Sequence, residues 1–231
     1  MKYTDFEDII SPERMNKYVE ACSHDTKRAM FLYRSNLRLS QEMFVLVSMF
    51  EVTLRNRIDV EMKKLYGDNW LRNFILPGGV FDTDSRVDGT KKIIKKAYEG
   101  LARCNRYSHC KLLAEMEFGV WKYMFNNVQY RLTGRCLLNI FPDKPKSTQS
   151  SHYDNTFVYN ELDKINNFRN RIAHHEPVCF GNARPAIIDT QGARECYASI
   201  IRLFQWMSIN TKDLLYGIDH VSAVCNKIMQ I

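Results

Sequence analysis

The sequence predicts an all-α protein, and three observations support this fold class. Apolar residues recur at three- and four-residue steps through most of the 231 residues, which is the period of an amphipathic helix. No segment shows the strict alternation of a half-buried strand. Hydrophobic residues make up 45% of the chain and aromatic residues 12%, so a packed core is expected. We therefore expect a helical bundle with additional helices, organised as a single domain over residues 1–231.

Capping residues predict where the first helices begin. Ser11 precedes Pro12, an order typical of an N-cap followed by the first helical residue. Asp25 is a second candidate start, and Ser40 is expected to cap a long helix that stops at Gly67. One buried stripe is expected along that helix: Met43, Phe44, Val47, Phe50, Leu54, Ile58 and Met62.

The middle of the chain predicts shorter helices between turns. Residues 67–90 are the least regular region, and a short helix with four basic residues follows: Lys91, Lys92, Lys95 and Lys96. Such a cluster is usually a solvated helix face, and contact with phosphate is the alternative. Ser108 is expected to begin a helix that continues through Phe125, where the internal Gly119 suggests close packing of a neighbouring helix. Another short helix is expected at about residues 127–140.

The C-terminal third predicts a loop followed by three more helices. Its elements are a loop at residues 142–151, a helix that begins at about residues 152–155, an irregular segment at 179–189 and two helices at about 190–207 and 211–230. Pro177 is expected to end the first of these helices, because proline cannot donate a backbone N–H and restricts the residue before it. His174 and His175 would then lie in its last turn.

The most informative pattern lies near the end of that helix. Asn170 follows Arg169 directly, and His174 lies five residues after the arginine. Chance placement in a chain of this composition gives roughly 0.03 matches to Arg-Asn-x3-His, so the pattern is moderately specific. In a helix, Asn170 and His174 share one face, whereas Arg169 lies about 140° from His174 around the axis. The alternative is a charged helix end, in which the arginines pair with carboxylates.

This pattern resembles the Arg-Asn-x3-His signature of the HEPN superfamily, and more narrowly its Abi-like (abortive infection) branch. Three stretches carry the resemblance in the order of the family, at residues 50–58, 112–121 and 168–177. The most specific strings are Phe-Gly-x-Trp at 118–121 and Arg-Asn-Arg-Ile-Ala-His-His-Glu-Pro at 169–177.

The resemblance implies a HEPN-like helical bundle with a core at about residues 40–180 and C-terminal helices at about 190–230. It also implies a homodimer, in which two copies of the motif form a composite cleft. The implied function is RNA cleavage, as a toxin in abortive-infection phage defence. An antitoxin, either a protein or an RNA, could be a further partner.

The motif residues suit cleavage of RNA without a metal. His174 would act as general base or acid, because imidazole exchanges a proton near neutral pH. Arg169 would stabilise the negative charge that develops on the phosphate, and Asn170 would orient the imidazole. The nucleophile would be the ribose 2′-OH, which makes the substrate RNA rather than DNA. Three neighbouring residues are expected to support the site: Arg171, His175 and Glu176. His175 would cap the helix, with proton transfer as the alternative, and Glu176 would either pair with Arg171 or lie in solvent.

Charge and cysteine usage limit the possible partners and the location. A net charge of +7 and a sequence pI of about 9.0 favour a polyanionic partner, although the same balance also serves solubility alone. The seven cysteines form no Cys-x2-Cys pair, and neither a signal peptide nor a run of 18 apolar residues is visible. We therefore expect reduced thiols in a cytoplasmic protein that has no membrane span. No residues show metal-ligand spacing, so no metal or cofactor is expected.

Two other functions are open on the sequence. A non-catalytic RNA-binding or regulatory helical module would keep the fold and a basic cleft without cleaving RNA. A helical oligomerisation protein would have no role with RNA. The intact set of Arg169, Asn170 and His174 favours the nuclease, because a degenerate copy is expected to lose the histidine.

Overall fold

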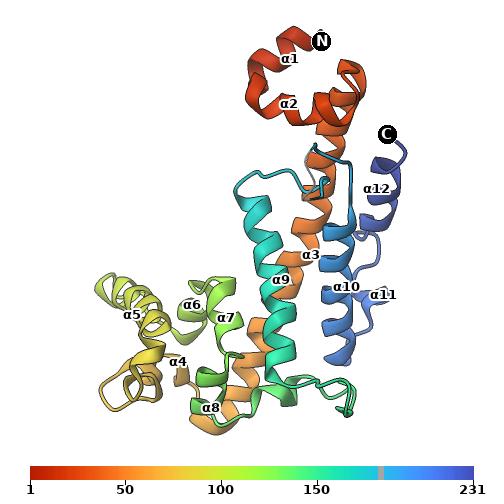
Figure 1. The fold of residues 1–231 in the computed structure, drawn as a ribbon. Coiled ribbons are helices and arrows are strands. Elements are labelled where there is room, and N and C mark those ends of the chain that lie inside the picture. Colours follow the sequence, from red (N-terminus) through yellow and green to blue (C-terminus); the bar gives the residue numbers. More distant parts are fainter. Residues whose placement is uncertain (182–184) are drawn as a thin grey trace. The chain divides into compact units, whose positions relative to one another are not determined.

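The computed structural model describes residues 1–181 and 185–231, and it confirms the all-α class (Figure 1). These residues form twelve α-helices and three short 3-10 helices. Within the same residues, paired extended backbone is limited to one isolated antiparallel bridge between Phe180 and Ile188. The predicted irregular segment at 179–189 therefore holds this bridge, and its residues 182–184 lie outside the described part of the chain.

The chain divides into two compact units. Unit 1 comprises Met1–Ser48, Asn167–Arg202 and Asn210–Ile231, and unit 2 comprises Met49–Asn166 and Leu203–Ile209. The predicted catalytic motif lies in unit 1, whereas the predicted basic cluster lies in unit 2. The expectation of one domain over residues 1–231 stays a prediction.

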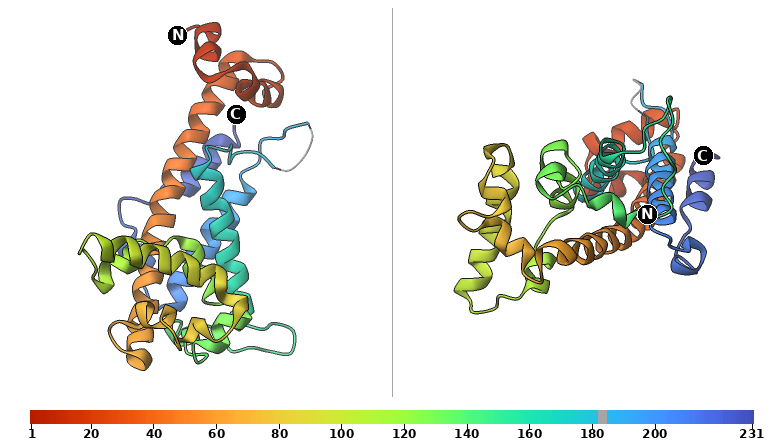
Figure 2. Two further views of the ribbon diagram at one scale, coloured as in Figure 1. Left: turned by 90° about the vertical axis from the view of Figure 1, so that its left-hand side faces the viewer. Right: turned by 90° about the horizontal axis from the view of Figure 1, so that it is seen from below.

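Unit 1 begins with two short helices, α1 (Tyr3–Ile10) and α2 (Pro12–Ala21). The predicted start of α2 is confirmed, because the Ser11 side chain accepts a hydrogen bond from the backbone N–H of Arg14. Both helices lie at the first turns of the next helix (Figure 2). There, Tyr33 makes edge-to-face ring contacts with Phe6 and Tyr18.

The next helix, α3 (Thr26–Tyr66), is 41 residues long, and its predicted start at Ser40 is wrong. The side chain of Asp25 caps it by accepting hydrogen bonds from the backbone N–H groups of Lys27 and Arg28. Ser40 does not interrupt the helix, because fully buried leucines continue the apolar stripe toward the N-terminus: Leu32 and Leu39. The predicted stop is confirmed, since Gly67 follows with a φ of +76°.

One member of the predicted stripe on α3 points away from the core. Phe44 is 53% exposed, whereas Met43 and Val47 on either side of it are buried. Leu37, two turns earlier, is also 51% exposed. Because residues 37 and 44 differ by seven positions, they lie on one face of the helix, and this face leaves two large apolar side chains uncovered.

Unit 2 contains the middle helices of the chain. They are α4 (Trp70–Ile75), η1 (Val80–Asp82), η2 (Ser85–Val87), α5 (Asp88–Arg103), α6 (His109–Ala114), α7 (Phe118–Tyr123), α8 (Asn127–Leu132) and η3 (Leu137–Ile140). The Ser108 cap is confirmed, because its side chain accepts a hydrogen bond from the N–H of Lys111. The helix predicted from Ser108 through Phe125 is nevertheless two helices, with the break at residues 115–117.

Two further expectations about these helices are wrong. Gly119 does not mark close packing, because a Cβ atom placed on it would meet nothing within 4 Å. The helix predicted at 127–140 is interrupted by Gly134 and Arg135, whose φ angles are +76° and +58°. Positive φ angles at two successive residues reverse the chain and separate α8 from η3.

The core of unit 2 includes a buried carboxylate with three donors. Asp59 Oδ1 accepts from Trp70 Nε1 at 2.8 Å and lies 2.6 Å from His109 Nε2, while Asp59 Oδ2 lies 2.7 Å from Lys63 Nζ. Burial alone would raise the pKa of Asp59, but hydrogen bonds from Lys63, His109 and Trp70 together lower it below its usual range. The carboxylate therefore links α3, α4 and α6 within unit 2.

The C-terminal elements follow the predicted order. The loop at 142–151 is confirmed, and it leads into α9 (Asn155–Ala173), which is followed by α10 (Gln191–Trp206), α11 (Thr211–Leu214) and α12 (Val221–Ile228). The single helix predicted at 211–230 is two helices, because the chain reverses at Gly217 with a φ of +74°.

Candidate functional site

The predicted catalytic residues lie at the C-terminal end of α9, in unit 1. Arg169 and Asn170 are in the helix, and His174 is the first residue after it. The backbone N–H of His174 still donates to the carbonyl oxygen of Asn170 at 2.9 Å. His174 is therefore held by a helical hydrogen bond although its own backbone has left the helix.

A reversal of the backbone ends α9, so the expectation that Pro177 ends it is wrong. The N–H of His175 donates to Ile172 O at 3.0 Å, and the N–H of Glu176 donates to Arg171 O at 2.8 Å. This pair of bonds is a Schellman motif, in which the residue at the position of His175 adopts a left-handed conformation. His175 has a φ of +56° where glycine is the usual residue. His174 and His175 thus lie just beyond the helix, not in its last turn.

Arg171 stabilises this reversal. Its Nη2 donates to the carbonyl oxygen of Pro177 at 2.5 Å, and its Nε lies 3.6 Å from Glu176 Oε2. The expected pairing of Arg171 with Glu176 is therefore present. These contacts hold the backbone after the helix. They also fit the alternative of a charged helix end, so the supporting roles of Arg171 and Glu176 stay a prediction.

The contacts between the predicted catalytic side chains differ from the expected geometry. Arg169 Nη1 donates to Asn170 Oδ1 at 3.4 Å. Among the described residues, no hydrogen bond joins the Asn170 side chain to the imidazole of His174. His174 is exposed, so its imidazole is accessible to solvent at the same end of α9. The structure thus places a cation, an amide and an accessible imidazole at one helix end.

Two anchors that the sequence does not reveal hold the chain after α9. Arg14 of α2 donates from Nη2 to the carbonyl oxygen of His175. Asn36 of α3, which is 4% exposed, accepts a hydrogen bond at 2.8 Å from the backbone N–H of Val178. These contacts span 161 and 142 residues of sequence, so no local pattern could have indicated them.

A shallow apolar groove of about 330 Å³ lies beside the motif, within unit 1. Its walls are the exposed face of α3 and the end of α9. Leu37 and Phe44 contribute the apolar side chains of α3, while Ile172, Ala173 and His175 contribute the other wall. Exposed apolar surface next to a candidate site commonly marks a place where another molecule binds.

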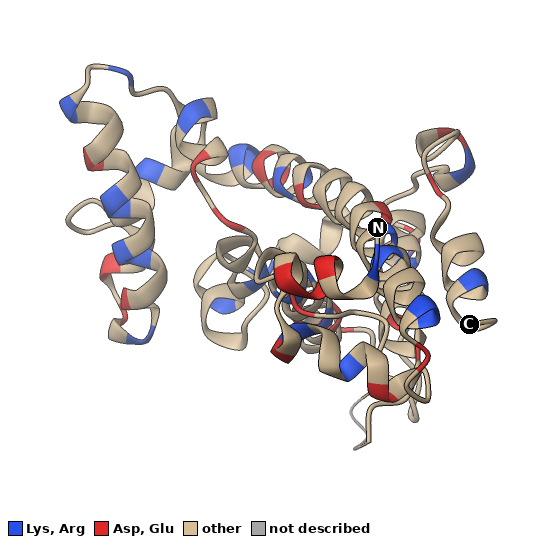
Figure 3. Cartoon of the chain, turned by 90° about the horizontal axis from the view of Figure 1, so that it is seen from above, with Lys and Arg blue, Asp and Glu red and all other residues tan. Residues whose placement is uncertain are grey.

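The four predicted RNA-binding lysines lie on α5 in unit 2 and differ in their partners. Lys91 pairs with Asp82 at 2.5 Å, and Lys95 lies 3.8 Å from Glu99. Lys92 and Lys96 form no ion pair within the described residues and are exposed. Figure 3 shows acidic positions interspersed among the cationic ones along this helix. The mixture is what a solvated helix face would show, so it adds little to the RNA expectation.

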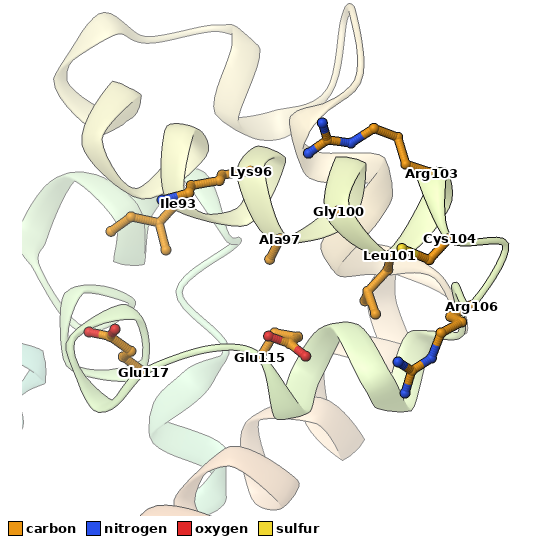
Figure 4. Close-up of a pocket in the computed structure, with 10 residues that line it drawn as sticks. All are labelled: Ile93, Lys96, Ala97, Gly100, Leu101, Arg103, Cys104, Arg106, Glu115 and Glu117. Carbon is orange, nitrogen blue, oxygen red and sulfur yellow. The ribbon is translucent and has the colours of Figure 1, made fainter.

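Lys96 also lines a groove of about 580 Å³ between α5 and the α6–α7 connection (Figure 4). Its wall on α5 is built from Ile93, Ala97, Gly100 and Leu101, and two carboxylates face it from the other side: Glu115 and Glu117. Three cationic side chains also line the groove: Lys96, Arg103 and Arg106. Because its charge is mixed, the groove shows no clear preference for the RNA backbone.

The described residues hold no group of three or more histidine, cysteine, aspartate or glutamate side chains arranged to bind a metal ion. All seven cysteines are free, and only Cys104 and Cys110 are exposed. Burial raises the pKa of the Cys179 thiol to about 12, so this residue is protonated at neutral pH.

No helix within the described ranges has both the length and the apolar character needed to cross a bilayer. In comparisons with known proteins, no family model, no curated protein and no solved structure matches the chain. The resemblance to the Abi-like branch of the HEPN superfamily therefore stays a prediction from the three sequence stretches.

Proposed function

We propose that the protein is a metal-independent endoribonuclease that cleaves RNA with Arg169, Asn170 and His174. The observation that carries the proposal is the exposed imidazole of His174, which is the first residue after α9, the helix whose last turns hold the Arg169–Asn170 pair. The well-anchored reversal after the helix supports it, because contacts from Arg14, Asn36 and Arg171 limit the movement of the backbone around this imidazole.

The proposed reaction begins when His174 removes the proton from a ribose 2′-OH. The 2′-oxygen attacks the adjacent phosphorus, the bond from phosphorus to the 5′-oxygen breaks, and a 2′,3′-cyclic phosphate forms. The leaving 5′-oxygen takes a proton from solvent water and becomes a hydroxyl. Arg169 stabilises the additional negative charge on the phosphate oxygens during this step. Asn170 positions the Arg169 guanidinium through the 3.4 Å contact, rather than the imidazole.

The proposed active species is a homodimer in which two copies of the motif contribute to one cleft. The groove beside the motif supports this, because its apolar residues Leu37 and Phe44 are more than half exposed in the single chain. A second copy that covered this groove would bury apolar surface and bring its own α9 end close to the first.

An RNA-cleavage assay in the presence of EDTA tests the reaction. The unchanged chain should cleave RNA and leave 2′,3′-cyclic phosphate ends, while His174→Ala should not. His24→Ala is a matched control, because His24 is also an exposed histidine beyond the end of a helix in unit 1. If the unchanged chain binds RNA but never cuts it, and Arg169→Ala alters neither result, a non-catalytic binding module explains the protein better.

The biological role proposed for this activity is that of a toxin in abortive-infection defence, and it rests on the sequence resemblance. Expression of the unchanged chain in bacterial cells should arrest growth, whereas His174→Ala should not. Equal growth in both cases, at equal protein levels, would contradict the toxin role but not the chemistry.

A further inference from the structure

A second pocket of unit 1 lies between α3 and α12, and its lining contains none of the residues proposed to cleave RNA. Its volume is about 320 Å³. Six residues line it: Phe31, Arg34, Ser35, Arg38, Val224 and Lys227. Three of these are cationic and none is acidic, which distinguishes this pocket from the mixed groove on α5.

The positive charge of the pocket is only partly neutralised. Arg38 Nη2 forms an ion pair at 2.6 Å with Glu42, one helical turn further along α3. Within the described residues, neither Arg34 nor Lys227 has a carboxylate partner. Two uncompensated cations therefore line a small concave surface, and such a surface attracts an anion.

Aromatic rings hold these two cations in place. The Arg34 guanidinium lies 5.2 Å from the centre of the Phe6 ring, and Lys227 Nζ lies 5.2 Å from the centre of the Phe31 ring. A cation–π contact positions the charge without using its N–H donors in a conventional hydrogen bond. Both side chains therefore keep donors for a ligand, and less side-chain entropy is lost when a ligand binds.

A hydroxyl group adds a further donor to the pocket. Ser35 is 8% exposed and lines the pocket. Its hydroxyl is not among the buried polar atoms of the described residues that lack a partner, so it is available at the pocket surface. An anion in the pocket would supply an acceptor for this hydroxyl.

The geometry points to a binding site for the phosphate of a nucleotide, either free or within a single-stranded RNA. The phosphate accepts hydrogen bonds from Arg34, Lys227 and Ser35. The pocket is larger than one phosphate needs, and Phe31 is 42% exposed at its edge, so a sugar and base can follow along this apolar side chain. This site is distinct from Arg169 and His174, and it does not depend on cleavage.

Two binding measurements on the full chain test the proposal and separate the two sources of the nucleotide. Calorimetry with adenosine 5′-monophosphate measures a free nucleotide. Fluorescence anisotropy with labelled single-stranded RNA measures the polymer, using a chain that carries His174→Ala so that the probe stays intact. The key variant combines Arg34→Gln with Lys227→Gln. Its matched control combines Lys2→Gln with Lys212→Gln, which removes the same charge from other exposed positions of unit 1.

We expect the double variant to weaken binding by at least about tenfold, because the loss of even one hydrogen bond to a charged group is worth about that factor. The control should bind within about twofold of the unchanged chain. Ser35→Ala, which preserves the shape of the buried side chain, should weaken binding by about fivefold. If the double variant loses affinity only for adenosine 5′-monophosphate, the ligand is a free nucleotide. If it loses affinity only for the labelled RNA, the ligand is RNA.

The proposal is overturned if the unchanged chain binds neither probe, or if the double variant and its control bind both probes equally. Circular dichroism of each variant establishes that the helices are intact. A chain that fails to cleave RNA but binds adenosine 5′-monophosphate through this pocket would contradict the proposed function while supporting the present inference.

Discussion

His175 holds a conformation that costs an L-amino acid free energy, and replacing it with glycine should stabilise the protein. Its φ of +56° lies in the left-handed region. This region costs a non-glycine residue about 1–2 kcal/mol. Glycine avoids that cost but loses about 0.5–1 kcal/mol more backbone entropy on folding. The difference predicts that His175→Gly raises the free energy of unfolding by about 0.5–1 kcal/mol.

Thermal unfolding measures this change. In a chain of this size, the expected gain corresponds to a rise of about 1–4 °C in the midpoint. Ser23→Gly is the matched control, because Ser23 has a φ of +52° and the same pair of backbone bonds at the end of α2. A rise for Ser23→Gly together with a fall for His175→Gly would refute the reasoning, since the contacts of the imidazole would then outweigh the strain.

The same variant distinguishes two roles of His175 in the proposed reaction. The backbone bonds of the reversal do not need an imidazole, so a purely supporting residue should be replaceable by glycine with little loss of RNA cleavage. If the loss matched that of His174→Ala in a stable protein, His175 would carry a proton itself.

Three other perturbations probe the scaffold and the groove. Asn36→Ala leaves the buried N–H of Val178 without an acceptor, so it should lower the free energy of unfolding in urea by about 1–3 kcal/mol. An unchanged unfolding midpoint would show that a water molecule replaces the amide. Phe44→Glu should convert a dimer to monomers in light scattering, whereas Ile9→Glu, at another exposed apolar position of unit 1, should not. If both variants remain dimers, the interface lies elsewhere. Asp59 has a lowered pKa in the folded protein, so its contribution is present above its unfolded value of about 3.8 and is lost as the pH falls through the folded value. Asp59→Asn should therefore reduce the loss in the free energy of unfolding as the pH falls into the acidic range. An unchanged pH dependence would show that Asp59 does not contribute to it.

The fold class was predictable because it depends on local periodicity, whereas several helix boundaries depend on tertiary packing. Ser11 and Gly67 act through local hydrogen bonds and backbone freedom, and both predictions are confirmed. Ser40 failed as a helix start because a serine inside a helix costs little when buried leucines continue the stripe on either side. Gly119 failed as a sign of close packing, since open space surrounds it.

The candidate site was predictable only as a set of positions. The sequence indicated that Asn170 and His174 share a helix face, but the structure gives Asn170 a contact with Arg169 instead. The reversal after α9 could not be expected, because histidine replaces the usual glycine and leaves no compositional signal. Arg14 and Asn36 were equally hidden, since only the tertiary fold brings them to this segment.

The anchors of α9 have a consequence for synthesis of the chain. Arg14 leaves the ribosome about 161 residues before the carbonyl group that it holds, and Asn36 leaves 142 residues before its partner. Closing chain segments of this length costs entropy that local helix formation does not require. The nascent protein can therefore form α1, α2 and most of α3 long before the surroundings of His174 exist. The candidate site is assembled late, when most of the molecule has already been made.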